Sequence, residues 1–102
     1  MGEFVKVTKT DDLPENSGKL VEVGGKRIAL LRTEDGYAAI DDVCPHRGGP
    51  LSDGEVEGNE VVCPWHGARF NVKTGEVLSP PAATGVASYN VRVSGDDIEI
   101  EV

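Results

Sequence analysis

The feature that most constrains this chain is the placement of its cysteines and histidines. The chain has two cysteines and two histidines, and all four lie in two short segments rich in glycine and proline. Cys44 and His46 lie in "VCPHRGG", and Cys63 and His66 lie in "VCPWHGARF". Thiolates and imidazoles are common ligands of transition metals. A chain that gathers all of them in two loops is therefore expected to fold around a metal centre.

The sequence on either side of these loops predicts β-strands. Residues 2–7, "GEFVKV", alternate briefly. In residues 18–41, a Gly-Gly pair and an Asp-Gly pair separate apolar runs, which predicts a meander. Residues 87–102 alternate on both sides of a Ser-Gly-Asp-Asp turn, which predicts an antiparallel hairpin with one solvated face. Because no segment shows helical periodicity of useful length, we expect an all-β protein.

The middle of the chain, roughly residues 41–81, differs from its ends. Glycine and proline interrupt it throughout, in "CPHRGGPLSDGEVEGN", "CPWHG", "KTGE" and "SPP". Functional residues usually lie on loops that a rigid scaffold holds in place. We therefore expect residues 1–102 to form one domain, in which a loop-rich metal-binding subdomain is inserted between two sheet-forming ends.

The charge and the apolar content of the chain exclude several classes of partner. Ten basic and 18 acidic side chains give a net charge of −8, which argues against nucleic acid or an anionic membrane. The acidity serves either solubility or docking onto a basic protein surface. No segment approaches twenty consecutive apolar residues, and the N-terminal residues do not read as a signal peptide. We therefore expect a cytoplasmic protein, whose reduced thiols bind metal instead of forming a disulfide.

Two kinds of metal centre compete for these four side chains. Zinc binds two cysteines and two histidines in a tetrahedron, but zinc fingers usually pair cysteine with cysteine and histidine with histidine. Here each loop offers one cysteine and one histidine. That arrangement favours a two-iron cluster, in which two cysteines hold one iron and two histidines hold the other. A zinc-stabilised binding module remains an alternative.

The motif C-x-H-x16-C-x2-H, with "CPHRGGPLS" and "CPWHGARF", resembles that of Rieske-type [2Fe-2S] proteins. The resemblance implies the all-β Rieske fold, with antiparallel sheets or a sandwich and one [2Fe-2S] cluster. It also implies that Cys44 and Cys63 ligate the inner iron, while His46 and His66 ligate the outer iron near the surface.

Other positions near the motif resemble further parts of such proteins. Pro80 and Pro81 resemble the proline loop that shields the cluster. Trp65 either packs on the surface or covers the cluster and shapes a partner contact. Arg47 and Arg69 are expected to be solvated charges. The acids between the two motifs are expected either to steer a partner or to aid solubility; they are Asp53, Glu55, Glu57 and Glu60.

At several positions this sequence differs from high-potential respiratory Rieske proteins, which argues against a respiratory function. Those proteins join two further cysteines as a disulfide, where this chain has Gly49 and Trp65. They also place a serine and a tyrosine, whose hydroxyls bond to sulfur near the cluster, where this chain has Ala68 and Phe70. With both donors missing, the reduction potential is expected near the low end of the Rieske range, about −150 mV.

The chain is not expected to be an enzyme by itself. The catalytic subunit of a Rieske oxygenase needs a second iron site with two more histidines and a carboxylate, and both histidines here are already assigned. The resemblance therefore implies a soluble, monomeric ferredoxin. It would accept electrons from a flavin-dependent reductase and pass them to a terminal oxygenase, such as one that acts on aromatic rings. The alternative is the small Rieske-like subunit of an assimilatory nitrite reductase.

Overall fold

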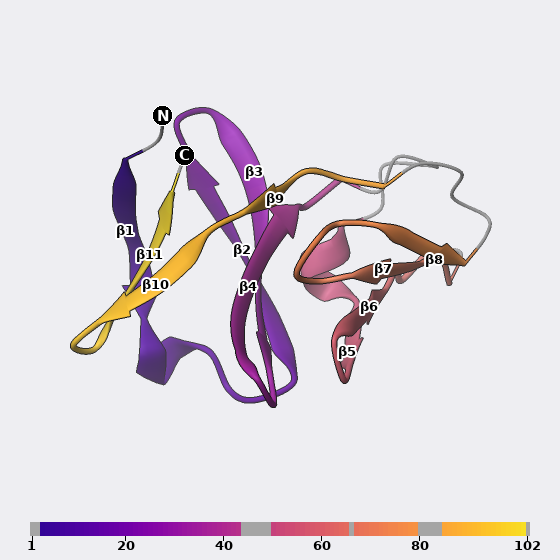
Figure 1. Ribbon diagram of the computed structural model, residues 1–102, viewed down its shortest axis with the longest axis horizontal. Coiled ribbons are helices and arrows are strands. Elements are labelled where there is room, and N and C mark those ends of the chain that lie inside the picture. Colours follow the sequence, from indigo (N-terminus) through magenta and orange to yellow (C-terminus); the bar gives the residue numbers. More distant parts are fainter. Residues whose placement is uncertain (1–2, 44–49, 66, 80–84, 102) are drawn as a thin grey trace.

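The computed structural model describes residues 3–43, 50–65, 67–79 and 85–101 (Figure 1). Within these ranges the regular structure consists of β-strands in three antiparallel sheets and two short 3₁₀-helices, so the predicted all-β class is confirmed. No helix in this part of the chain is long and apolar enough to cross a membrane.

The central sheet contains the predicted meander. Its strands follow the order β2 (Ser17–Val23), β3 (Lys26–Thr33), β4 (Gly36–Asp41) and β9 (Ser88–Tyr89). The turn between β2 and β3 places Gly24 at φ 57° and Gly25 at φ 80°. Two consecutive residues with positive φ are typical of a tight turn whose twist matches that of the flanking strands. The Gly-Gly signal in the sequence therefore marks this turn correctly.

The second sheet contains the two ends of the described chain. Its strands follow the order β1 (Phe4–Lys9), β11 (Asp97–Glu101) and β10 (Val91–Ser94). The predicted hairpin of β10 and β11 is confirmed, but its first strand is shorter than expected. At Asn90 the chain changes sheets: Tyr89 pairs with Ala39 of β4, whereas Val91 pairs with Ile100 of β11.

The third sheet lies in the loop-rich middle of the chain, where the sequence pattern did not predict strands. Four strands of three residues each form a complete antiparallel sheet, in the order β5 (Glu55–Glu57), β6 (Glu60–Val62), β7 (Arg69–Asn71) and β8 (Val77–Ser79). A three-residue strand shows barely one period of alternation, so a sequence pattern cannot reveal it. The 3₁₀-helix η2 (Leu51–Asp53) leads into this sheet, and the other, η1 (Thr10–Asp12), follows β1.

Strands β3 and β4 are buried on both faces, and this positions the third sheet. Ile28 and Leu30 pack toward the second sheet, together with Ile98 and Ile100. The alternate residues of β3 and β4 pack against the third sheet, in a core formed by Ala29, Leu31, Ala38, Ile40, Leu51, Val56, Val61, Cys63, Ala68, Phe70 and Val72. Burial on both faces explains the uninterrupted run "IALL" in β3. The third sheet therefore rests on the central sheet, on the side away from β1, β10 and β11 (Figure 1).

Candidate metal centre

Of the four predicted ligands, Cys63 lies within the described residues. Cys44, His46 and His66 lie outside them, as do Pro80 and Pro81. Cys63 follows the last residue of β6, is only 3% exposed and is a free thiol. Burial of a thiol at the end of a strand, where the chain enters a loop, is the environment expected of a cluster ligand.

Backbone hydrogen bonds close the loop that begins at Cys63. The amide of Cys63 donates to the carbonyl of Ala68 at 2.7 Å, and the amide of Gly67 donates to the carbonyl of Cys63 at 3.0 Å. Gly67 has φ 76°, a left-handed conformation that glycine adopts without steric cost. The chain therefore turns sharply after Cys63 and re-enters the sheet at β7. We call residues 63–68 the second loop.

We call residues 44–49, which contain the other Cys/His pair, the first loop, and the residues on either side of it are held together. Val43 and Pro50 form an isolated antiparallel bridge. Asp42 accepts two hydrogen bonds from beyond the loop, since its carbonyl receives the amide of Leu51 at 2.7 Å and its Oδ1 receives the amide of Ser52 at 2.8 Å. Because Asp42 is 1% exposed, these buried amides are satisfied by a side chain and a carbonyl that water barely reaches.

Asp42 is a residue that the sequence analysis did not single out. The available signal was an acid at the end of an apolar strand, two positions before a predicted metal ligand. Short acidic side chains commonly accept hydrogen bonds from nearby backbone amides, but the sequence alone does not say which amide would come within reach.

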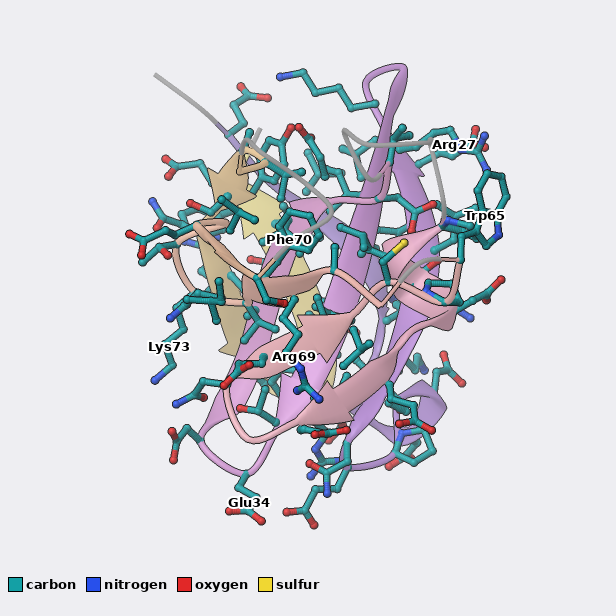
Figure 2. All side chains as sticks on the ribbon, turned by 90° about the vertical axis from the view of Figure 1, so that its right-hand side faces the viewer. Arg27, Glu34, Trp65, Arg69, Phe70 and Lys73 are labelled. Carbon is teal, nitrogen blue, oxygen red and sulfur yellow. The ribbon has the colours of Figure 1, made fainter. Side chains whose placement is uncertain are left out.

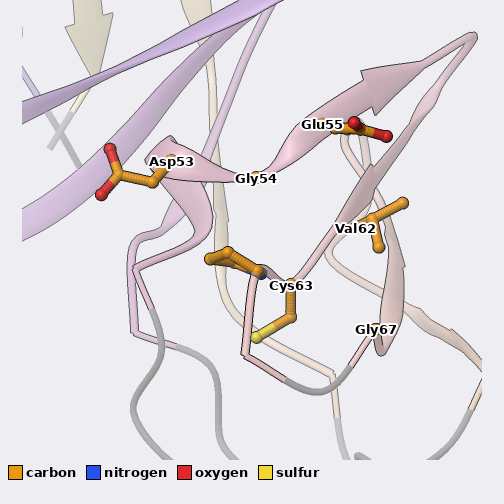
Figure 3. Close-up of a pocket in the computed structure, with 7 residues that line it drawn as sticks. Asp53, Gly54, Glu55, Val62, Cys63 and Gly67 are labelled. Carbon is orange, nitrogen blue, oxygen red and sulfur yellow. The ribbon is translucent and has the colours of Figure 1, made fainter.

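A pocket of about 470 Å³ lies where the segment that follows η2 meets the end of β6 (Figure 3). Residues from both sides line it, namely Asp53, Gly54 and Glu55 after the first loop, and Val62, Cys63, Pro64 and Gly67 around the second. The structure therefore brings the thiol of Cys63 beside the segment that leaves the first loop.

Asp41 holds residues 87–89 against the end of β4. Its amide donates to the carbonyl of Ala87 at 2.9 Å, and its carboxylate accepts the amide of Ala87 at 3.3 Å and the hydroxyl of Tyr89 at 2.6 Å. Burial, together with the neighbouring Asp41 carboxylate, raises the pKa of Tyr89 to about 12. The phenol therefore stays protonated and keeps donating at physiological pH.

The four acids predicted to steer a partner fall into two groups. Glu57 and Glu60 lie 3.2 and 3.6 Å from the Arg69 guanidinium, so Arg69 is more than a solvated charge. The hydrogen bond that the Arg69 guanidinium donates to Glu57 is the main reason why the pKa of Arg69 is raised. Asp53 and Glu55 form no ion pair with any described residue, and they line the pocket beside Cys63.

Trp65 and Phe70 have opposite environments although both lie close to Cys63 in the sequence. Trp65 is 56% exposed. Figure 2, which looks onto the third sheet, shows it at the rim of the molecule. Phe70 is fully buried on β7 opposite Val61, and Ala68 is also fully buried. Trp65 is therefore available to a partner, whereas Ala68 and Phe70 belong to the packing behind the second loop.

The family comparison agrees with this chemistry. Residues 3–90 match the model of the Rieske [2Fe-2S] domain. This match covers most of the chain, so the chain belongs to the Rieske [2Fe-2S] domain family, and its cofactor is one [2Fe-2S] cluster. A buried cysteine that lines a pocket at the end of a strand fits a cluster of this kind.

Among curated proteins, the chain is 41% identical over 83 residues to the ferredoxin component of the naphthalene 1,2-dioxygenase/salicylate 5-hydroxylase systems of a Ralstonia species. The match covers 81% of this chain and 80% of that protein. Among solved structures, it is similar to a chain in the complex of reduced oxygenase and oxidised ferredoxin of carbazole 1,9a-dioxygenase. That match has a TM-score of 0.88 and 30% identity, and covers 96% of this chain and 92% of the other.

The fold is also similar to that of a nitrite reductase small subunit. A structure described as the small subunit of an NADH-dependent nitrite reductase from Mycobacterium tuberculosis has a TM-score of 0.90 and 25% identity. That match covers 100% of this chain and 96% of the other. Backbone similarity therefore does not distinguish oxygenase ferredoxins from nitrite reductase small subunits. Sequence identity is higher to the Ralstonia ferredoxin component, at 41%, than to the nitrite reductase subunit, at 25%.

Proposed function

We propose that this chain is the ferredoxin component of an oxygenase system. It takes one electron at a time from a flavin-dependent reductase and delivers it to a terminal oxygenase that hydroxylates aromatic rings. The observation that carries the proposal is the buried Cys63 beside residues 53–55, in a chain that matches a dioxygenase ferredoxin over four-fifths of both lengths.

We assign Cys44 and Cys63 to the inner iron of the cluster, and His46 and His66 to the outer iron. The burial of Cys63 supports the inner assignment for that residue, which is 3% exposed. When bound, the cluster supplies a site that gains and loses a single electron. Asp42 holds the ends of the first loop together, and the Cys63–Ala68 hydrogen bond closes the second.

The surface around the pocket is the part of the chain that meets the redox partners. Trp65 is exposed two positions after Cys63, and aromatic side chains are enriched where proteins bind each other. Asp53 and Glu55 add negative charge beside the pocket. An acidic rim speeds association with a basic partner surface, so the docking face of the oxygenase carries lysine or arginine. We place the carrier in the cytoplasm. Its high net charge favours a monomer, because like charges repel each other.

A role as the small subunit of a nitrite reductase is the second candidate, favoured by the similar fold of the Mycobacterium tuberculosis chain. Reconstitution distinguishes the two functions. The purified chain is mixed with a flavin-dependent ferredoxin reductase, NADH and the naphthalene dioxygenase terminal component, and hydroxylated product is measured with and without the chain. Product that depends on the chain supports the proposal. A chain that loads iron but supports no oxygenase turnover, and that instead copurifies with a nitrite reductase large subunit, contradicts it.

A further inference from the structure

Gly54 lies where the segment leaving the first loop crosses the backbone of β6. A Cβ atom added at Gly54 would lie 2.1 Å from the carbonyl oxygen of Val62 and 3.2 Å from that of Leu51. Both atoms belong to the backbone, so no side-chain rotation could relieve the contact. Gly54 has φ −76° and ψ 165°, which any residue adopts. The close approach of two chain segments, and not an unusual backbone conformation, is therefore what requires glycine here.

This crossing directly adjoins the proposed cluster ligand. Strands β5 and β6 pair Glu55 with Val62, so the next pair in the same register would be Gly54 and Cys63. Gly54, Val62 and Cys63 all line the same pocket (Figure 3). The contact at Gly54 therefore holds the segment that follows residues 44–49 against the residue before Cys63.

Gly54 is also linked to the other end of the first loop. Its amide donates to the carbonyl of Leu51 at 3.0 Å, and the amide of Leu51 in turn donates to the carbonyl of Asp42 at 2.7 Å. A short path of backbone contacts therefore runs from Asp42, directly after β4, through Leu51 and Gly54 to Val62, the residue before Cys63.

We infer that Gly54 is a positioning residue, whose missing side chain sets the separation of the two loops and hence of the ligands they carry. This inference rests on the proposed ligand set. Relief of the contact in an alanine variant requires the 2.1 Å separation to reach at least 3.0 Å. That displacement, roughly 1 Å, exceeds the tolerance of about 0.2 Å on ligand distances in a metal site. A methyl group at position 54 would therefore disturb the site before it disturbs the distant sheets.

Two matched variants separate positioning from general destabilisation. Gly58→Ala changes a glycine in the same β5–β6 hairpin, where φ is 59° and no atom lies within 4 Å of the added Cβ. It strains the backbone without pushing the loops apart. Ile98→Val removes a methylene-sized volume from the core between the first two sheets, on the far side of β3 and β4. Both variants are expected to lower the unfolding temperature without changing the cluster.

The experiment compares the wild type with Gly54→Ala, Gly58→Ala and Ile98→Val, all purified with their native metal. It measures iron per folded chain, the EPR g-values of the reduced protein, the reduction potential, and the rate at which a chelator removes iron. We expect Gly54→Ala to retain the circular dichroism of the sheets, to lose iron at least about tenfold faster and to show altered g-values. The two control variants should keep the g-values and the iron-release rate of the wild type.

Two results would overturn the inference. Gly54→Ala with the iron content, g-values and iron-release rate of the wild type would show that the close approach does not set ligand geometry. Failure of Gly54→Ala to fold, while both controls fold, would show that the glycine serves the whole fold and not the site. The wild-type sample separately tests the proposed function, because a wild type without a [2Fe-2S] spectrum contradicts that proposal whatever the variants do.

Discussion

At the scale of single residues, one buried carboxylate joins the segments before and after residues 44–49. Asp42 accepts the amide of Ser52 through Oδ1 in a place that solvent barely reaches. Replacement of Asp42 by alanine leaves that amide without its partner, which costs about 1–3 kcal/mol. The thermal midpoint of Asp42→Ala is expected to fall by at least about 4 °C. Asp42→Asn keeps an acceptor oxygen and should lose less. Equal midpoints for Asp42→Ala and the wild type would show that Ser52 finds another acceptor.

Ala68 and Phe70 are the residues expected to keep the reduction potential low. Both are fully buried, and the carbonyl of Ala68 accepts the amide of Cys63. A hydroxyl bonded to sulfur near the cluster stabilises the reduced state, and about 1.4 kcal/mol corresponds to about 59 mV for one electron. The double variant Ala68→Ser with Phe70→Tyr should therefore raise the potential by on the order of 100 mV. Protein-film voltammetry measures the shift. An unmoved potential in a double variant with an intact cluster would exclude these positions as its determinants.

At the scale of elements, Tyr89 ties β9 to the end of β4 through Asp41. The pKa of Tyr89 is raised from 10.0 to about 12 in the folded chain, so the folded state holds this proton more tightly than the unfolded state does. The contribution of the protonated phenol is complete below pH 10 and is lost as the pH rises toward 12. Tyr89→Phe should therefore lose less stability than the wild type between pH 10 and 12.

The thermal midpoints of wild type, Tyr89→Phe and Tyr37→Phe, recorded from pH 9 to 12, test this expectation. Tyr37→Phe removes a hydroxyl but leaves the bond between Tyr89 and Asp41 in place, so its profile should follow that of the wild type. If Tyr89→Phe and the wild type fall in parallel across this range, the phenol of Tyr89 does not titrate with unfolding.

The elements also show which parts of the fold the sequence could predict. The Gly-Gly turn and the hairpin of β10 and β11 were predictable because turn residues and several periods of alternation mark them. The third sheet was not, because its strands are three residues long. The change of sheet at Asn90 was missed because alternation continues through it, and only the pairing partners differ.

Of the candidate site, the Cys/His motif could be predicted from the sequence, but the residues that support it could not. The Cys/His motif led to the family through its spacing alone, and the environment of Cys63 fits that assignment. The roles of Asp42 and Gly54 depend on contacts with Ser52 and Val62, which come from other segments. Such contacts leave no pattern in a single sequence, and neither does the pairing of Glu57 with Arg69.

At the scale of the whole molecule, the net charge is −8. Some of the acids between the two Cys/His motifs are paired with arginine, and others are free to contact a partner. Glu57 is paired with Arg69, whereas Asp53 and Glu55 border the pocket. Charge steering acts over about 10 Å at 0.1 M salt. Asp53→Asn and Glu55→Gln should therefore slow electron transfer to the oxygenase and flatten its dependence on salt.

Glu57→Gln is the matched control, because it changes the net charge by the same amount but frees Arg69. Stopped-flow rates between about 0.05 and 0.5 M salt distinguish the variants, since exposed charges are screened progressively over this range. Equal slowing by all three substitutions would indicate that only the net charge matters. A wild-type rate that does not change with salt would instead indicate apolar docking around Trp65.

We propose that the protein as a whole carries one electron at a time on a cluster with mixed cysteine and histidine ligands. A redox titration of the purified protein, followed by EPR with iron and sulfide quantified in the same sample, tests it most directly. We predict two irons and two acid-labile sulfides per chain, a rhombic signal that appears with uptake of one electron, and a midpoint potential near about −150 mV. A colourless protein that contains stoichiometric zinc and gives no signal, even when made with ample iron, would contradict the claim.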